Sequence, residues 1–196
     1  MRRRDFIKVI VGSAATWPLA ALGQQTEHMR RIGVLMNRAA SDREGQARVT
    51  AFKEGMQQRG WSEGRNVQID VGWGEDDIDL EQKYAAELIA LAPDVIFASG
   101  TLSVAALRRL NRAVPIVFAN VTDPLGAGFV DSLNRPGGNT TGFMIYEYTL
   151  SGKWLELLKE IAPKVTRVGI LRNPDNPAGV ALFGAIQAEA LLRSSY

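Results

Sequence analysis

The chain has 196 residues, with 23 basic and 21 acidic side chains and a formal net charge of +2. Residues 1–23 hold four basic residues and one acidic residue, so the remaining chain, with 19 basic and 20 acidic residues, lacks the basic excess of a nucleic-acid-binding protein. Because cysteine is absent and His28 is the only histidine, disulfides, thiolate chemistry, a multi-histidine metal site and a Ser-His-Asp triad are excluded.

The first residues carry the pattern of an export signal. Arg3 and Arg4 stand one spacer before a Phe-Ile-Lys run, which resembles the twin-arginine export signal of bacteria. The apolar stretch 9–22 is shorter than the roughly 20 residues that a membrane-spanning helix needs. A small-residue step ends at Gly23, where signal peptidase is expected to cut. We therefore expect 1–23 to be a signal peptide read by the twin-arginine translocase, and the mature protein to be periplasmic. A short N-terminal anchor or amphipathic helix is the alternative.

Beyond residue 30, short β-branched runs alternate with helical stripes of apolar residues. Strands are predicted at 32–36, 66–71, 94–98, 115–119 and about 141–145. Four helices are predicted between these strands. The first has Val49, Phe52 and Met56 on its apolar face, and the second has Asp79 as N-cap and an apolar face of Leu80, Tyr84, Leu88 and Leu91. The third runs from 101 to about 112, and the fourth lies near 127–133. With 46% hydrophobic residues to form a core, this alternation predicts an α/β fold, a Rossmann-like lobe with a parallel sheet over 31–147.

A second unit is predicted from residue 148. The pattern indicates a helix over 151–162, a strand over 167–171 and another helix behind it. Because only one strand–helix unit precedes Tyr196, we expect 148–196 to be the start of a second α/β lobe that is incomplete.

In an open parallel sheet, ligands bind beyond the carboxyl ends of the strands. Ser99, Gly100 and Thr101 follow one predicted strand and open a helix. Their hydroxyls, their backbone N–H groups and the helix dipole are suited to a ligand carboxylate. The alternative is that Ser99 or Thr101 caps its own helix.

Other strand ends offer further polar side chains. Asn120, Thr122 and Asp123 follow one strand, and the Asp123 carboxylate is a candidate partner for a ligand ammonium group. Asn37 follows the first strand, and Asn173 follows the strand predicted in the second unit. Ordinary turns are the alternative at these positions, since Asn-Pro steps are common turn formers.

No phosphate-binding motif accompanies these loops. The chain contains neither Gly-x-Gly-x-x-Gly after a strand nor Gly-Lys-Ser/Thr. Gly126 and Gly128 begin a similar pattern, but Asp131 takes the place of the third small residue and would repel a pyrophosphate. We expect no nucleotide cofactor, no other cofactor and no metal.

Several segments occur together in a distinctive combination: Trp-Pro-Leu-Ala at 17–20, Ser-Gly-Thr at 99–101, Pro-Ile-Val-Phe at 115–118, Thr-Asp-Pro at 122–124, Ser-Leu-Asn-Arg-Pro-Gly-Gly-Asn-Thr-Thr-Gly at 132–142 and Leu-Arg-Asn-Pro at 171–174. Over essentially residues 1–190 the chain resembles the ABC-transporter substrate-binding proteins of the tryptophan/tyrosine-binding type. The resemblance implies a type I periplasmic-binding fold, in which two Rossmann-like lobes joined by hinge strands hold a ligand in their cleft without catalysis. It also implies ligand contacts at Ser99, Thr101, Asn120, Thr122 and Asp123 on the first lobe and at Asn173 on the second.

The resemblance leads us to expect an exported solute-binding component of an ABC importer, with an inner-membrane permease as its partner and a small polar or amino-acid-like ligand. Two alternatives stay open. One is an exported α/β enzyme of hydrolase type, which would need a nucleophile or metal constellation. The other is a sensory or regulatory ligand-binding domain, which as a cytoplasmic regulator would carry a helix-turn-helix at its N-terminus.

Overall fold

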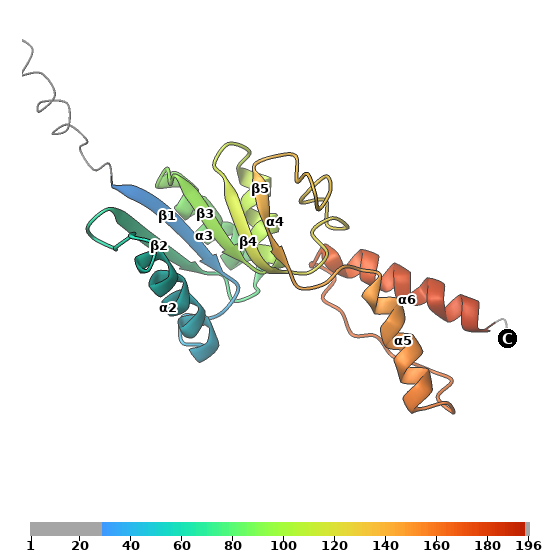
Figure 1. The fold of residues 1–196 in the computed structure, drawn as a ribbon. Coiled ribbons are helices and arrows are strands. Elements are labelled where there is room, and N and C mark those ends of the chain that lie inside the picture. The colour runs from blue at the N-terminus through green and yellow to red at the C-terminus, as the bar shows by residue number, and fades with distance from the viewer. Residues whose placement is uncertain (1–28, 195–196) are drawn as a thin grey trace, which may run out of the picture.

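The computed structural model describes residues 29–194, so the predicted signal peptide with Arg3 and Arg4 lies outside the described residues. Its centre is a sheet of five parallel strands in the order β2-β1-β3-β4-β5 (Figure 1). The strands are β1 (Arg30–Met36), β2 (Val67–Trp73), β3 (Val95–Ser99), β4 (Ile116–Val121) and β5 (Thr140–Met144). The predicted α/β fold with a parallel sheet is confirmed.

Helix α2 (Arg43–Gln57) covers one face of this sheet (Figure 1). Its predicted apolar face is confirmed: Val49 is buried, and Phe52 stacks on Phe97 of β3 with ring centroids 5.0 Å apart. The helix begins where the Asp42 carboxylate accepts the backbone N–H of Gly45 at 2.7 Å. This cap and the apolar stripe fix α2 against β1, β2 and β3.

Helices α3 (Ile78–Ala90) and α4 (Thr101–Leu110) cover the opposite face. Ala85 and Leu88 of α3 and Leu107 of α4 are buried there against Ile96 of β3. Because both faces of the sheet are covered, its central strands are apolar on both sides, as a buried parallel sheet requires.

The predicted start of α3 is wrong by two residues. Asp77, not Asp79, is the N-cap: its backbone is extended, and its Oδ1 accepts the N–H groups of Asp79 and Leu80, each at 3.0 Å. The buried face is also rotated from the predicted one, since Glu81, Ala85 and Leu88 are buried whereas Leu91 is exposed. The carboxylate that caps a helix must stand just outside its first turn, which Asp79 does not.

The helix predicted near 127–133 is absent, and turns occupy this segment. The N–H groups of Ala127 and Phe129 donate to the carbonyls of Asp123 and Pro124, but Gly128 has φ +70°, which ends any helical continuation. Val130 and Phe129 are buried against the α4 face of the sheet. Apolar packing therefore determines this loop, and helical hydrogen bonding does not.

The second unit contributes two helices, α5 (Leu150–Ile161) and α6 (Ala178–Ser194), both of which were predicted. They contact each other, and Ser151 Oγ of α5 lies 3.1 Å from the carbonyl oxygen of Leu182 in α6. The strand predicted over 167–171 is not formed, because no other strand in the described part of the chain pairs with it. Within residues 29–194, no helix is long and apolar enough to cross a membrane.

Candidate ligand-binding site

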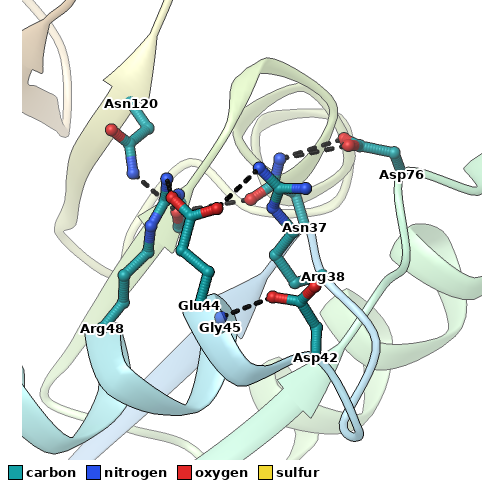
Figure 2. Close-up of polar contacts among 9 residues, drawn as sticks. Asn37, Arg38, Asp42, Glu44, Gly45, Arg48, Asp76 and Asn120 are labelled. Atoms are coloured by element: carbon teal, nitrogen blue, oxygen red, sulfur yellow. Dashed lines mark hydrogen bonds and ion pairs between the residues drawn. The ribbon is translucent and has the colours of Figure 1, made fainter.

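The carboxyl ends of β1, β3 and β4 are neighbours at one edge of the sheet, and there they bring three predicted residues together. Asn120 Nδ2 donates to Ser99 Oγ at 3.3 Å, and Ser99 Oγ donates to Asn37 Oδ1 at 3.4 Å. Asn37 Nδ2 in turn lies 3.2 Å from both carboxylate oxygens of Asp76 (Figure 2). We call Asn37, Asp76, Ser99 and Asn120 the polar row.

The members of the polar row differ in exposure. Ser99 is only 1% exposed, whereas Asn37 and Asn120 are partly exposed and Asp76 is exposed. The buried Ser99 hydroxyl therefore connects the side-chain amides of Asn37 and Asn120. These two amides and the Asp76 carboxylate are the groups that a ligand can reach.

Gly100 and Thr101 form the turn from β3 into α4. Gly100 has φ +100°, and a Cβ built on it would lie 2.7–2.9 Å from side-chain atoms of Asn37. Only glycine permits both this backbone conformation and this close approach. The N–H of Gly100 already donates to the carbonyl of Ala119 at 3.0 Å, so it completes the sheet and is not available to a ligand.

Thr101 does not cap its own helix. Gly100 is the N-cap of α4 and makes no side-chain cap bond, while Thr101 Oγ1 accepts the N–H of Thr122 at 3.3 Å. Thr101 is buried and Thr122 is partly exposed. The Thr101 hydroxyl therefore ties the loop after β4 to the start of α4, which places Thr122 beside the polar row.

Asp123 lies in the same loop, but its carboxylate is turned inward. It is 1% exposed, its Oδ1 accepts the N–H of Gly126 at 3.0 Å, and its Oδ2 is buried without a hydrogen-bond partner among the described residues. The backbone has φ +46° here and +56° at Asn120, a left-handed conformation that is uncommon for residues other than glycine. Asn120 stands at the irregular end of β4 and Asp123 in the loop that follows, and such conformations are often concentrated at functional sites.

Asn173 of the second unit stands in a turn of its own. Its Oδ1 accepts the N–H of Asp175 at 2.9 Å, and its carbonyl accepts the N–H of Asn176 at 3.3 Å. Asp175 lines a small cavity with residues of α3 and α4, among them Glu81 and Arg109. The turn that follows the unformed strand thus lies against the first lobe, and Asn173 is exposed in it.

A charged cluster that the sequence analysis missed lies beside the polar row. Glu44 pairs with Arg48 one helical turn away and with Arg38 at 3.5 Å (Figure 2). The spacing of Glu44 and Arg48 is a recognisable helical ion-pair pattern, so this part could have been predicted. The Arg38 contact depends on the β1–α2 loop, which no periodicity reveals.

A second missed residue is Glu81, whose side chain is completely buried between α3 and α4. Burial raises the pKa of this carboxyl from 4.5 to about 8; the hydrogen bond with Ser103 opposes the rise, and the charges of Asp76 and Asp77 add to it. Glu81 is spaced with Ala85 and Leu88 on one helical face, and this is the signal in the sequence that could have indicated it.

The polar row consists of two side-chain amides, one hydroxyl and one carboxylate. In the described part of the chain, no group of three or more histidine, cysteine, aspartate or glutamate side chains is placed to hold a metal ion. Amides donate and accept, and the Asp76 carboxylate accepts only. Together they match a small molecule that carries both donors and acceptors.

A larger cavity, of about 390 Å³, lies between α5, α6 and the segment 165–170, away from the polar row. Leu155, Val168 and Ile170 contribute to its mostly apolar lining. Lys159, Thr166 and Gln187 add polar groups to this lining, but none of the residues of the polar row contributes to the cavity.

Comparisons with known proteins identify the family and the fold. Residues 40–190 match the family model described as ABC transporter substrate binding protein. The tyrosine-binding protein of Clostridioides difficile (strain R20291) is 34% identical over 122 residues, which cover 62% of this chain and 35% of that protein.

Two solved structures are similar over 84% of this chain and 54% of their own. A conserved domain protein from Vibrio cholerae O1 biovar El Tor has 27% identity and a TM-score of 0.72. An ABC domain from Streptococcus pneumoniae, solved in complex with L-Trp, has 24% identity and a TM-score of 0.70. The chain thus spans about half the length of these solved relatives, and its sheet is the Rossmann-like lobe of a type I periplasmic-binding fold.

Proposed function

Because this chain belongs to the ABC transporter substrate-binding protein family, we propose that it is an exported solute-binding component of an ABC importer. Its ligand is a small polar or amino-acid-like molecule, which it binds without catalysis. The tyrosine-binding relative, 34% identical over 122 residues, supports an aromatic amino acid as the first ligand to test.

The observation that carries this proposal is the polar row across the ends of four adjacent strands. An amino acid is a zwitterion: its ammonium group needs acceptors, which Asp76 and the Asn120 carbonyl oxygen provide, and its carboxylate needs donors. The side-chain amides of Asn37 and Asn120 and the Thr122 hydroxyl are such donors. The two amides share an anchor at Ser99, which holds them in place before the ligand arrives and so reduces the entropy lost on binding.

The second lobe supplies the opposing wall of the cleft. We place the beginning of the second lobe at residue 148, and we expect Asn173 to be the residue of this lobe that contacts the ligand. Asp123, in the loop after β4, belongs to the first lobe. A ligand that touches both lobes favours the closed state by its higher affinity for that state, and the closed protein then docks on an inner-membrane permease. This chain spans about half the length of its solved relatives.

Titration calorimetry of the 196-residue chain tests the binding proposal. We expect heat of binding with L-tyrosine and none with D-xylose. The Asn120→Asp variant should weaken binding about tenfold, because it replaces a donor with a negative charge facing the ligand carboxylate. Asn134→Asp, at an exposed asparagine, is the matched control. Binding of the sugar instead of the amino acid, or equal affinity in both variants, would refute the proposal.

Export is tested separately. We propose that the twin-arginine translocase reads Arg3 and Arg4 and that cleavage near Gly23 releases the mature protein into the periplasm. A double Arg3→Lys, Arg4→Lys variant should remain in the cytoplasm of a bacterial host, while the neighbouring Arg2→Lys control is exported. Recovery of the double variant from the periplasm would show that export does not depend on Arg3 and Arg4.

A further inference from the structure

Glu81 is linked to the polar row through Ser103, whose hydroxyl lies between the Glu81 carboxyl and the backbone carbonyl of Ser99. Its carboxyl occupies the space beside Gly74, where a built Cβ would lie 2.1 Å from the carboxyl carbon. One carboxyl oxygen is 3.1 Å from Ser103 Oγ, and the other is buried without a hydrogen-bond partner among the described residues. The structure therefore makes room for a carboxyl group at this point but provides few donors for a carboxylate.

The two contacts of the Ser103 hydroxyl can both be hydrogen bonds only when Glu81 is protonated. Ser103 Oγ is 2.8 Å from the carbonyl oxygen of Ser99 and 3.1 Å from Glu81 Oε1. A hydroxyl has one proton, and a carbonyl can only accept. When Ser103 donates to the carbonyl of Ser99, Glu81 must donate to Ser103, so Glu81 carries a proton in this arrangement.

The charges around Glu81 favour that form. Asp76 and Asp77 at the β2–α3 turn repel a second negative charge. From the other side, Arg109 of α4 and Asp175 of the 173–177 turn share the small cavity that Glu81 lines, so one positive and one further negative group face it there. Burial is the largest influence and acts in the same direction, toward the neutral acid.

We propose that Glu81 is a positioning residue for ligand binding: its protonated carboxyl donates to Ser103, and Ser103 donates to Ser99, which fixes the turn at Gly100 and Thr101. When Glu81 loses its proton, the Ser103 hydroxyl turns to the carboxylate and leaves the Ser99 carbonyl without this donor. The polar row then loosens, and ligand affinity falls as the pH rises through the pKa of Glu81. The effect on ligand rests on the proposed function, whereas the effect on the turn does not.

The test uses backbone amide shifts of Gly100 and Thr101, measured by ¹⁵N NMR between pH 5.5 and 9.5 without ligand. In the wild type they should titrate with a midpoint near 8. Glu81→Gln keeps a donor for Ser103 but cannot ionise, so its turn should not titrate. Glu87→Gln, at an exposed position of the same helix, should behave as the wild type.

The affinity for L-tyrosine is then measured at pH 6 and pH 8.5 for the wild type and for Glu81→Gln. The ratio of the two affinities is compared between the two pH values, because the ionisation of the ligand itself cancels in this ratio. Wild-type affinity should fall about 3- to 10-fold relative to Glu81→Gln, the effect of one neutral hydrogen bond. If Glu81→Gln does not fold, the carboxyl ¹³C shift of Glu81 in the wild type gives its titration directly. In Ser103→Ala the turn should then no longer follow that titration.

The outcomes separate the two proposals. A turn that ignores pH, or that titrates equally in Glu81→Gln, overturns the role of Glu81. A turn that titrates as expected supports that role even if L-tyrosine shifts no amide of the polar row, in which case the proposed function is the one that fails. An affinity ratio that does not change with pH, although L-tyrosine binds at the polar row, overturns the coupling to ligand.

Discussion

The side-chain amide of Asn120 donates to the hydroxyl of Ser99 across 3.3 Å, and this bond joins the ends of two neighbouring strands, β4 and β3. Ser99 passes the connection on to Asn37 at the end of β1. One buried hydroxyl thus orients two partly exposed amides, and the orientation of those amides is what a ligand would meet.

Ser99→Ala should therefore weaken binding although Ser99 itself is almost completely buried. Both amides lose a partner, so we expect an affinity loss of about 3- to 10-fold for L-tyrosine and a stability loss of about 1 kcal/mol. Calorimetry and urea unfolding measure the two effects. Ser132→Ala, which removes a hydroxyl from a loop outside the polar row, is the control and should leave affinity unchanged. Unaltered affinity in Ser99→Ala would mean that the amides hold their positions without the serine.

Gly100→Ala should destabilise the fold by more than about 1 kcal/mol, because φ is +100° and the new Cβ would overlap the side chain of Asn37. Gly138→Ala is the matched control, since a Cβ at Gly138 meets nothing within 4 Å. Urea denaturation compares the free energies of unfolding. Equal losses in both variants would show that the turn tolerates a side chain.

The assignment of the α3 cap is also testable. Asp77→Ala removes a carboxylate that accepts two backbone N–H groups, so we expect a stability loss of about 1 kcal/mol. Asp79→Ala removes only a favourable charge in the first turn, which is worth about 0.3 to 1 kcal/mol. If thermal unfolding ranks the two variants the other way, the helix begins later than the structure places it.

Stability should depend on pH through Glu81. Its pKa rises from 4.5 to about 8 on folding, so the folded state binds the proton more tightly than the unfolded state. Protonation therefore favours folding: the contribution is complete below about pH 4.5, decreases as the pH rises and is lost above about pH 8. The difference in unfolding free energy between wild type and Glu81→Gln should fall across this window. A constant difference would place the pKa of Glu81 near its ordinary value.

The sheet could be predicted because its strands are buried on both faces. Continuous apolar runs such as Val95–Ser99 leave little choice between strand and helix when prolines and short loops bound them. All five strands of the first lobe were found within about two residues of their bounds. The strand predicted over 167–171 has the same pattern, but a strand exists only with a partner, and the described residues offer it none.

The site could be predicted only in part. The rule that ligands bind at the carboxyl ends of parallel strands placed Asn37, Ser99 and Asn120 at one edge. It could not tell that Ser99 and Thr101 are buried supports, since burial depends on how the loops pack. Glu81 was missed because a charged residue on a helix is normally assigned to the exposed face.

The central claim is that the polar row is where this protein binds an amino acid. The most direct test is the ¹⁵N NMR spectrum of the chain during titration with L-tyrosine. We expect the largest shifts in the backbone amides of residues 99–101 and 120–123 and in the side-chain amides of Asn37 and Asn120. Shifts confined to residues 165–170 and the helices around them would instead place the ligand in the larger cavity and show that the polar row is not the binding site.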